Sequence, residues 1–132
     1  MKIPKQPRRR KTDRKILIAE LDKLFSRLVR LEAKGHCEVC GRPKTFEELA
    51  CCHIFSRKNL NTRWDKKNAF GGCWQCHLQF AHKEPIRFYD WVRERLGDEE
   101  FKKLRQRADT SAKGLDLMAV KIYLESELLK KV

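Results

Sequence analysis

The runs C-E-V-C-G at residues 37–41 and G-G-C-W-Q-C-H at residues 71–77 decide the fold that we expect for this chain. Each run contains a C-x2-C pair, in which both sulfurs can turn toward one point. Two such pairs supply the four thiolates of a closed, tetrahedral structural zinc site. The spacing therefore predicts one structural Zn²⁺ that ties together two segments distant in sequence. Its expected ligands are Cys37, Cys40, Cys73 and Cys76.

Two other interpretations of the cysteines stay open. Ordinary buried cysteines are the first, although two C-x2-C pairs are unexpected by chance in a chain with 37% charged residues. Disulfides are the second, and we find no secretory segment that would indicate an oxidising compartment. We therefore expect an intracellular, cytoplasmic metalloprotein. The remaining cysteines, Cys51 and Cys52, are interpreted as inert buried thiols.

Basic charge dominates the composition. The 132 residues carry a formal net charge of +13, which favours a polyanionic partner, most simply nucleic acid. An anionic membrane surface is the rival partner. However, no apolar run approaches the ~20 residues that span a bilayer, so we expect no transmembrane segment.

The chain divides into four parts. Residues 1–11 form a basic tail that we expect to be flexible, and residues 12–35 an N-terminal helix. Residues 36–97 form the zinc-stapled core, and residues 98–132 a C-terminal helical extension. The fold class that we expect is α+β. The tail serves either as a solubilising arm or as a set of DNA phosphate contacts through Arg8, Arg9, Arg10 and Lys11.

Helical signals flank the core. The first helix should run from about Asp13 to Lys34, with Thr12 or Asp13 as its cap and Gly35 at its end. Apolar faces at residues 17–31 and 115–129 are suited either to packing within the chain or to a homodimer interface. Two further helices are predicted, one from Pro85 as its first residue to Gly97 as its terminator, and the next with Asp98 as its cap.

Inside the core we expect a short strand from Cys51 to Phe55, which includes Cys52 and His53. Side chains alternate along a strand, so Cys51 and His53 should share one face. A helical turn is predicted over residues 45–50, and a loop or hairpin return over residues 59–67. After the last cysteine the chain should turn helical.

Three polar residues within this core suggest phosphodiester hydrolysis, which needs a base to activate water and a cation to offset phosphate charge. His53 is the best base, because an imidazole of pKa ~6.5 accepts a proton at neutral pH. Asn68 can shape the loop or accept a hydrogen bond from the second ring nitrogen of His53. His77, next to a zinc cysteine, can bind a divalent cation. Taken alone, each histidine would more often be structural.

The order C-x2-C, His53, Asn68, C-x2-C, His77 resembles the HNH (ββα-metal, His-Me finger) endonucleases. More narrowly, C-H-I-F-S-R-K and T-R-W-D-x-x-N resemble the NinG/Rap recombination endonucleases of phages. That family is implicated in cleaving branched intermediates such as Holliday junctions. The resemblance covers about residues 37–95. It implies a zinc-supported, treble-clef-like ββα core, His53 as general base, and Mg²⁺ or Mn²⁺ near His77.

Two positions depart from the family pattern. Many HNH nucleases carry a metal-binding aspartate directly before the base histidine, where this chain has Cys52, a soft ligand poorly matched to Mg²⁺. The position after the last cysteine is often asparagine in the narrower family and is His77 here. The catalytic metal shell therefore stays open, with Asp65 and His82 as alternative ligands.

Arg57 and Arg63 flank the expected active face, where guanidinium groups can bind DNA phosphates at two points. The alternative for each is a solvated charge or a bond to a carboxylate. Three functions are consistent with these features: an endonuclease acting on branched DNA, an HNH nuclease acting on ordinary duplex or a specific site, and a non-catalytic zinc module that binds nucleic acid.

Overall fold

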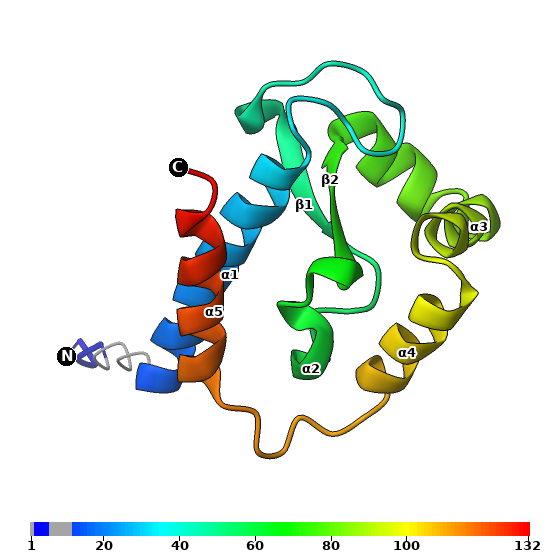
Figure 1. The fold of residues 1–132 in the computed structure, drawn as a ribbon. Helices are drawn as coiled ribbons and strands as arrows, with labels where there is room; N and C mark the ends of the chain where they lie inside the picture. Colours follow the sequence, from blue (N-terminus) through cyan, green and yellow to red (C-terminus); the bar gives the residue numbers. More distant parts are fainter. Residues whose placement is uncertain (1, 6–11) are drawn as a thin grey trace.

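The structure is a computed structural model that describes residues 2–5 and 12–132. The predicted phosphate contacts of Arg8, Arg9, Arg10 and Lys11 lie outside the described residues. The fold is α+β, as predicted, with a two-stranded antiparallel sheet between groups of helices (Figure 1). Its helices are α1 (Asp13–Glu32), α2 (Leu60–Arg63), α3 (Pro85–Leu96), α4 (Asp98–Ala108) and α5 (Leu117–Leu129). The strands are β1 (Leu49–His53) and β2 (Ala69–Cys73), and shorter helical segments are η1 (Phe46–Glu48), η2 (Lys66–Asn68) and η3 (Cys76–His82).

The two strands place the cysteines and the central histidine at opposite ends of the sheet. Leu49 pairs with Cys73 at one end, and His53 pairs with Ala69 at the other. β2 is buried along its whole length. Gly71 lets the end of α1 approach it closely, since a Cβ there would lie 2.7 Å from the Cβ of Ala33.

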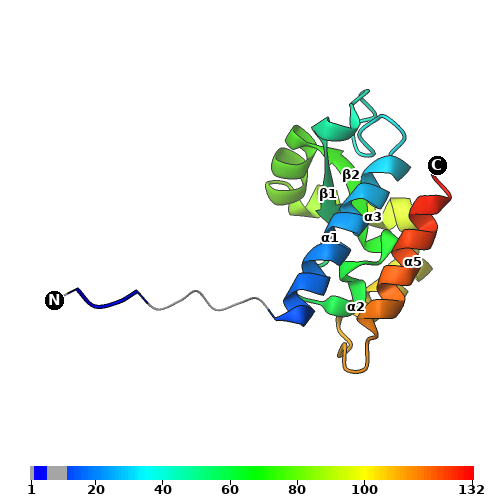
Figure 2. The ribbon, with the colours of Figure 1, turned by 90° about the vertical axis from the view of Figure 1, so that its left-hand side faces the viewer.

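The largest apolar core lies between α1 and α5, which run side by side in parallel (Figures 1 and 2). The apolar faces predicted at residues 17–31 and 115–129 contact each other within the chain. Buried members of this core are Leu21, Phe25, Leu28, Val29, Trp64, Ala69, Leu117 and Leu124. The predicted cap is confirmed, because the Thr12 side chain accepts a hydrogen bond from the Lys15 N–H at 3.3 Å.

A second, aromatic contact joins β2 to α3. The rings of Phe70 and Trp91 meet edge to face with centroids 4.9 Å apart, and Phe88 packs against both. Pro85 begins α3, and Gly97, at φ 82°, follows its last residue, as predicted. None of the helices in the described part of the chain combines the length and apolar character needed to cross a bilayer.

Three local predictions need correction. The strand runs from Leu49 to His53 rather than from Cys51 to Phe55, and the helical turn is η1, which is shorter than the predicted residues 45–50. Residues 59–67 are not a plain loop, because α2 and the start of η2 lie there, packed inward through the buried Thr62 and Trp64. Asp98 makes no capping hydrogen bond, because its carboxylate accepts from the Arg93 guanidinium at 3.0 and 3.2 Å and Gly97 takes the cap position.

Candidate metal centre and histidine cleft

The four cysteines of the two C-x2-C pairs converge on one point. The Sγ atoms of Cys37, Cys40, Cys73 and Cys76 all lie within 4.8 Å of one another. The Sγ atoms of Cys40 and Cys73 are 3.9 Å apart. A Zn–S bond of about 2.3 Å in a tetrahedron implies sulfurs about 3.8 Å apart. The cluster therefore fits a tetrahedral metal such as zinc.

Local backbone geometry shapes the first cysteine pair. Gly41, at φ 75°, follows Cys40 in a conformation that favours glycine. Its N–H donates to the Cys37 carbonyl at 2.9 Å, which closes the turn. The second pair begins at the last residue of β2, so the pairing of Cys73 with Leu49 fixes its position relative to the sheet.

The electrostatics of the cluster favour a bound cation. Burial alone would raise the pKa of Cys37, but backbone N–H groups of Cys40, Cys73 and Val39 lower it to about 7. Burial, followed by the neighbouring sulfurs, raises the pKa of Cys76. Four thiolates at this separation repel one another unless a positive ion lies among them. The donor set therefore matches a closed structural zinc site.

Cys51 and Cys52 stand apart from this cluster. Burial raises the pKa of each thiol to about 12, so both stay protonated at neutral pH. Cys52 is only 1% exposed, whereas Cys51 and His53 on the other face of β1 line surface depressions. Cys52 is therefore not placed to bind a metal beside His53, although it occupies the position at which many HNH nucleases carry an aspartate.

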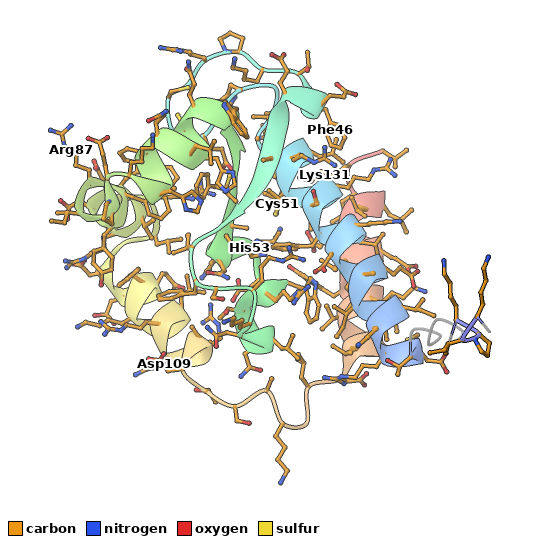
Figure 3. All side chains as sticks on the ribbon, turned by 180° about the vertical axis from the view of Figure 1, so that it is seen from behind. Phe46, Cys51, His53, Arg87, Asp109 and Lys131 are labelled. Atoms are coloured by element: carbon orange, nitrogen blue, oxygen red, sulfur yellow. The ribbon has the colours of Figure 1, made fainter. Side chains whose placement is uncertain are left out.

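His53 opens onto a cleft of about 600 Å³ that also contains His77 and His82. Figure 3 shows Cys51 and His53 on β1, with α1 on one side of the strand and the helical segments that follow β2 on the other. The rings of His77 and His82 meet edge to face, with centroids 5.0 Å apart. Both belong to η3, a π-helical segment whose i→i+5 hydrogen bonding brings residues five apart onto one face.

The orientation of His53 is fixed by one short hydrogen bond. Its Nε2 lies 2.8 Å from the backbone carbonyl of Arg63, which can only accept, so Nε2 carries the proton and Nδ1 keeps the lone pair. Burial lowers the pKa of His53 below its ordinary value, so the ring is neutral at pH 7. This combination gives a positioned proton acceptor.

Asn68 holds the backbone around His53 rather than touching the ring. Its Oδ1 accepts from the Phe55 N–H at 2.7 Å, and its Nδ2 donates to the carbonyls of Phe55 and Thr62 at 3.2 and 2.9 Å. The side chain is fully buried and does not line the cleft. Of its two predicted roles, shaping the loop is the observed one, and the hydrogen bond from His53 goes to Arg63 instead.

Sequence reasoning missed Asp22 of α1, which gathers the residues around Arg63. Its carboxylate accepts from Arg63 Nε at 2.9 Å and Nη2 at 2.6 Å, from Arg57 Nη2 at 2.9 Å and from Trp64 Nε1 at 3.0 Å. Burial would raise the pKa of Asp22, but hydrogen bonds from Arg63 and Trp64 lower it. Arg57 and Arg63 thus show the carboxylate pairing that was their alternative interpretation, and DNA contact by them stays a prediction.

The two alternative metal ligands separate clearly. Asp65 accepts from the Arg107 guanidinium at 2.7 and 3.0 Å and caps η2 through Lys67 N, and it does not line the histidine cleft. His82 does line it. His36, the spare histidine beside the first cysteine pair, is exposed and contacts the Lys34 carbonyl.

Comparison with known proteins found no matching family model, no similar curated protein and no similar solved structure. Two sites on the α+β scaffold carry chemistry: a four-cysteine cluster that could hold a metal, and a cleft that contains three histidines.

Proposed function

We propose that this protein is a metal-dependent DNA endonuclease of the HNH, or ββα-metal, type, with a zinc-supported treble-clef-like core. The observation that carries the proposal is the position of His53: its Nε2 is held by a backbone carbonyl, and it lines the same cleft as His77 and His82. The order β1, β2, η3 supplies the two strands and helical segment of a ββα unit. The net charge of +13 supports a polyanionic substrate.

His53 acts in this mechanism as the general base. Water that attacks the scissile phosphate must lose a proton, and Nδ1 of His53 has the free lone pair to take it. The lowered pKa keeps this nitrogen unprotonated at neutral pH. The carbonyl of Arg63 stabilises the imidazolium that forms, because Nε2–H keeps donating to it. A general base of this kind contributes ~10²–10⁴-fold to the rate.

His77 and His82 are the residues that would hold the catalytic cation. A divalent ion there would offset the charge that builds up on the phosphate. No carboxylate lines the cleft in the described part of the chain, so the protein donors are imidazole nitrogens. Mg²⁺ demands oxygen ligands in near-ideal octahedral geometry, whereas Mn²⁺, a transition metal, accepts imidazole nitrogens beside oxygen ligands. We therefore expect stronger activity with Mn²⁺ than with Mg²⁺.

Plasmid nicking tests the proposal. Zinc-loaded protein with added Mn²⁺ or Mg²⁺ should nick supercoiled plasmid, and His53→Ala should reduce nicking by two orders of magnitude or more. His36→Ala is the matched control, because it removes an exposed histidine outside the cleft. Wild-type nicking by the His53→Ala variant would overturn the assignment of His53 as the base.

Branched recombination intermediates are the proposed substrate, on the motif resemblance to the NinG/Rap family. Symmetric cleavage of a junction needs two active sites, which a two-fold homodimer would supply. A cleavage panel of four-way junction, flap, duplex and single strand tests the substrate, and light scattering with and without DNA tests the dimer. Equal rates on junction and duplex would favour the second hypothesis, an HNH nuclease for ordinary duplex.

One observation favours a non-catalytic zinc module instead. Among the residues that the structure describes, the cleft offers no oxygen ligand from a carboxylate. If the zinc-loaded protein binds DNA but nicks nothing with Mn²⁺, Mg²⁺ or Co²⁺, the non-catalytic zinc module is the correct function.

A further inference from the structure

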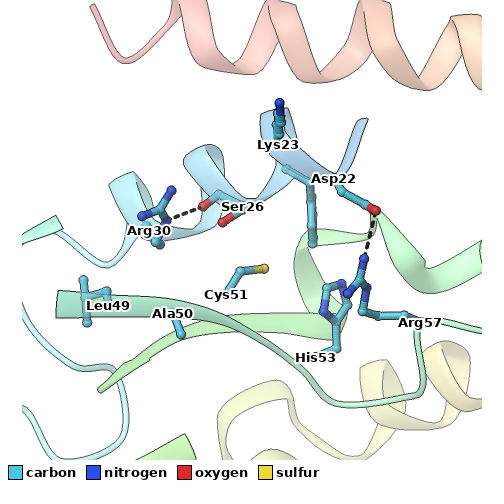
Figure 4. Close-up of a pocket in the computed structure, with 10 residues that line it drawn as sticks. Asp22, Lys23, Ser26, Arg30, Leu49, Ala50, Cys51, His53 and Arg57 are labelled. Carbon is cyan, nitrogen blue, oxygen red and sulfur yellow. Dashed lines mark hydrogen bonds and ion pairs between the residues drawn. The ribbon is translucent and has the colours of Figure 1, made fainter. Parts of the chain in front are cut away.

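A second depression, of about 540 Å³, lies between α1 and β1 and meets the histidine cleft at His53 (Figure 4). We call it the α1–β1 groove. One wall is α1, with Asp22, Lys23, Phe25, Ser26 and Arg30, and the other is β1, with Leu49, Ala50, Cys51 and His53. Both depressions are lined by Cys51, His53 and Arg57, so the two depressions form one continuous surface across β1.

Arg30 is the distinctive cation of this groove. Its Nε donates to the Ser26 carbonyl at 3.3 Å, and its guanidinium carbon lies 4.0 Å from the centre of the Phe46 ring. Within residues 2–5 and 12–132, no carboxylate lies at ion-pair distance from it. Arg30 is therefore fixed in direction without being neutralised, and its terminal N–H groups can bind an anion.

The other charges of the groove leave it positive. Asp22 is its acidic residue, and that carboxylate is already engaged by Arg57 and Arg63. Lys23 adds a further cation on α1. Arg57 and Arg63, which the sequence predicted to contact DNA, are thus occupied, whereas Arg30, which the sequence did not single out, is not.

We propose that the α1–β1 groove binds the phosphodiester backbone of a nucleic acid strand, with Arg30 holding one phosphate while a later phosphate lies at His53. This inference rests on the proposed function and supplies the path of its substrate. Arg30 lies beside the Leu49 end of β1, and His53 ends the strand (Figure 4). The four residue steps along β1 cover about 13 Å. Each strand of duplex DNA carries one phosphate per about 3.4 Å of helix axis, so this length corresponds to several phosphates of one DNA strand.

Binding measurements with matched arginine variants test the groove. Arg30→Ala should weaken DNA binding about tenfold, the loss expected for a charge-assisted hydrogen bond. It should also reduce the slope of log affinity against log salt by about 1. Arg27→Ala is the control, because it removes the same charge from the same helix but faces the C-terminal end of α5. Its affinity should stay within about twofold of wild type.

Ser26→Glu provides a second variant that does not depend on truncating Arg30. Glutamate four residues before arginine pairs with it on a helix, so the change should preserve α1 and neutralise Arg30. Affinity should fall at least as much as in Arg30→Ala. Fluorescence anisotropy of zinc-loaded full-length protein on labelled duplex and single-stranded DNA, without added divalent cation, gives the affinities free of cleavage.

The outcomes separate this inference from the proposed nuclease activity. Equal effects of Arg30→Ala and Arg27→Ala, or no effect of Arg30→Ala, would overturn the groove. Tighter Arg30-dependent binding to phosphatidylserine vesicles than to DNA would overturn it as well. Arg30-dependent DNA binding by a protein that never nicks DNA would sustain the groove and overturn the nuclease. Nicking by a protein whose DNA binding does not depend on Arg30 would sustain the nuclease and overturn the groove.

Discussion

The cysteine cluster and the histidine cleft lie toward opposite ends of the same two strands and are built differently. Cys73 pairs with Leu49 at one end, and His53 pairs with Ala69 at the other. The cluster has four mutually close thiols, which complete a tetrahedral shell. The cleft has histidines, an open side and no carboxylate among the described residues. A complete shell holds a metal permanently, whereas an incomplete one leaves positions for water and substrate.

The largest effect, on the stability of the core, is expected when the cysteine cluster is lost. Removing zinc, or replacing Cys37 by serine, should unfold the core, because a structural zinc contributes apparent free energies of about 10–16 kcal/mol to small domains. Elemental analysis should find one Zn²⁺ per chain, and circular dichroism should show loss of structure after chelation. Cys51→Ala, outside the cluster, should keep the zinc. Protein purified without chelator that contains no zinc would contradict the structural assignment.

The cleft should respond to lost ligands more gently. His77→Ala and His82→Ala should each reduce nicking, and activity should partly return at high Mn²⁺, because mass action refills a weakened site. His53→Ala should lower the cleavage rate ~10²–10⁴-fold, and high Mn²⁺ should not restore it, since a metal cannot replace a base. Single-turnover cleavage across a Mn²⁺ titration measures both. Recovery of the His53 variant at high Mn²⁺ would place that residue in the metal shell instead.

The Asp22 contacts predict an intermediate effect. Asp22→Asn should destabilise the protein by about 1.5–3 kcal/mol, the range for hydrogen bonds to charged groups. It should also shift the ¹⁵N NMR signals of His53, because Arg63 both pairs with Asp22 and supplies the carbonyl that holds the ring. Asp98→Asn is the control, since its pair with Arg93 is exposed and worth about 0–1 kcal/mol. Unchanged His53 signals in Asp22→Asn would mean that the Asp22–Arg63 pair does not position the carbonyl that holds the His53 ring.

The smallest effect concerns pH. The pKa of native His53 is lowered, so near its ordinary value the unfolded chain binds more protons than the native one. Its contribution to stability is therefore complete above the ordinary pKa of about 6.5 and falls as pH decreases toward the native pKa. Urea unfolding from about pH 5 to about pH 8, compared between wild type and His53→Gln, measures it. A contribution that grows as pH falls would mean that the native pKa is raised.

Local signals explain which parts of the structure could be predicted from sequence. The Thr12 cap, the Pro85 start and the Gly97 end of their helices depend on neighbouring residues only, and each was confirmed. The four-cysteine cluster was predictable because C-x2-C spacing carries its own geometry. The prediction of Asp98 as a cap was wrong, because its carboxylate accepts hydrogen bonds from Arg93 instead.

The residues that shape the cleft gave no comparable local signal. Asp22 looks like any polar position on an amphipathic helix, yet it lies 41 residues from the arginine that it binds. His82 shares a face with His77 only because the segment is π-helical, and an α-helix would have turned it away. Arg30 differs from Arg27 only in what packs beside it.

The sequence by itself determined the four-cysteine cluster, the α+β class, the basic charge and the choice of His53 as candidate base, because each depends on residue type and short spacing. Only the tertiary structure decided that Asn68 shapes a loop, that Asp65 and Cys52 lie outside the cleft, and that His82 lies within it. Packing of α1 against β1 and β2, and the bond from Arg63 of α2 to Asp22 of α1, bring the relevant side chains together from distant parts of the chain. Spacing along a chain constrains such encounters weakly, because long loops close at little extra entropic cost.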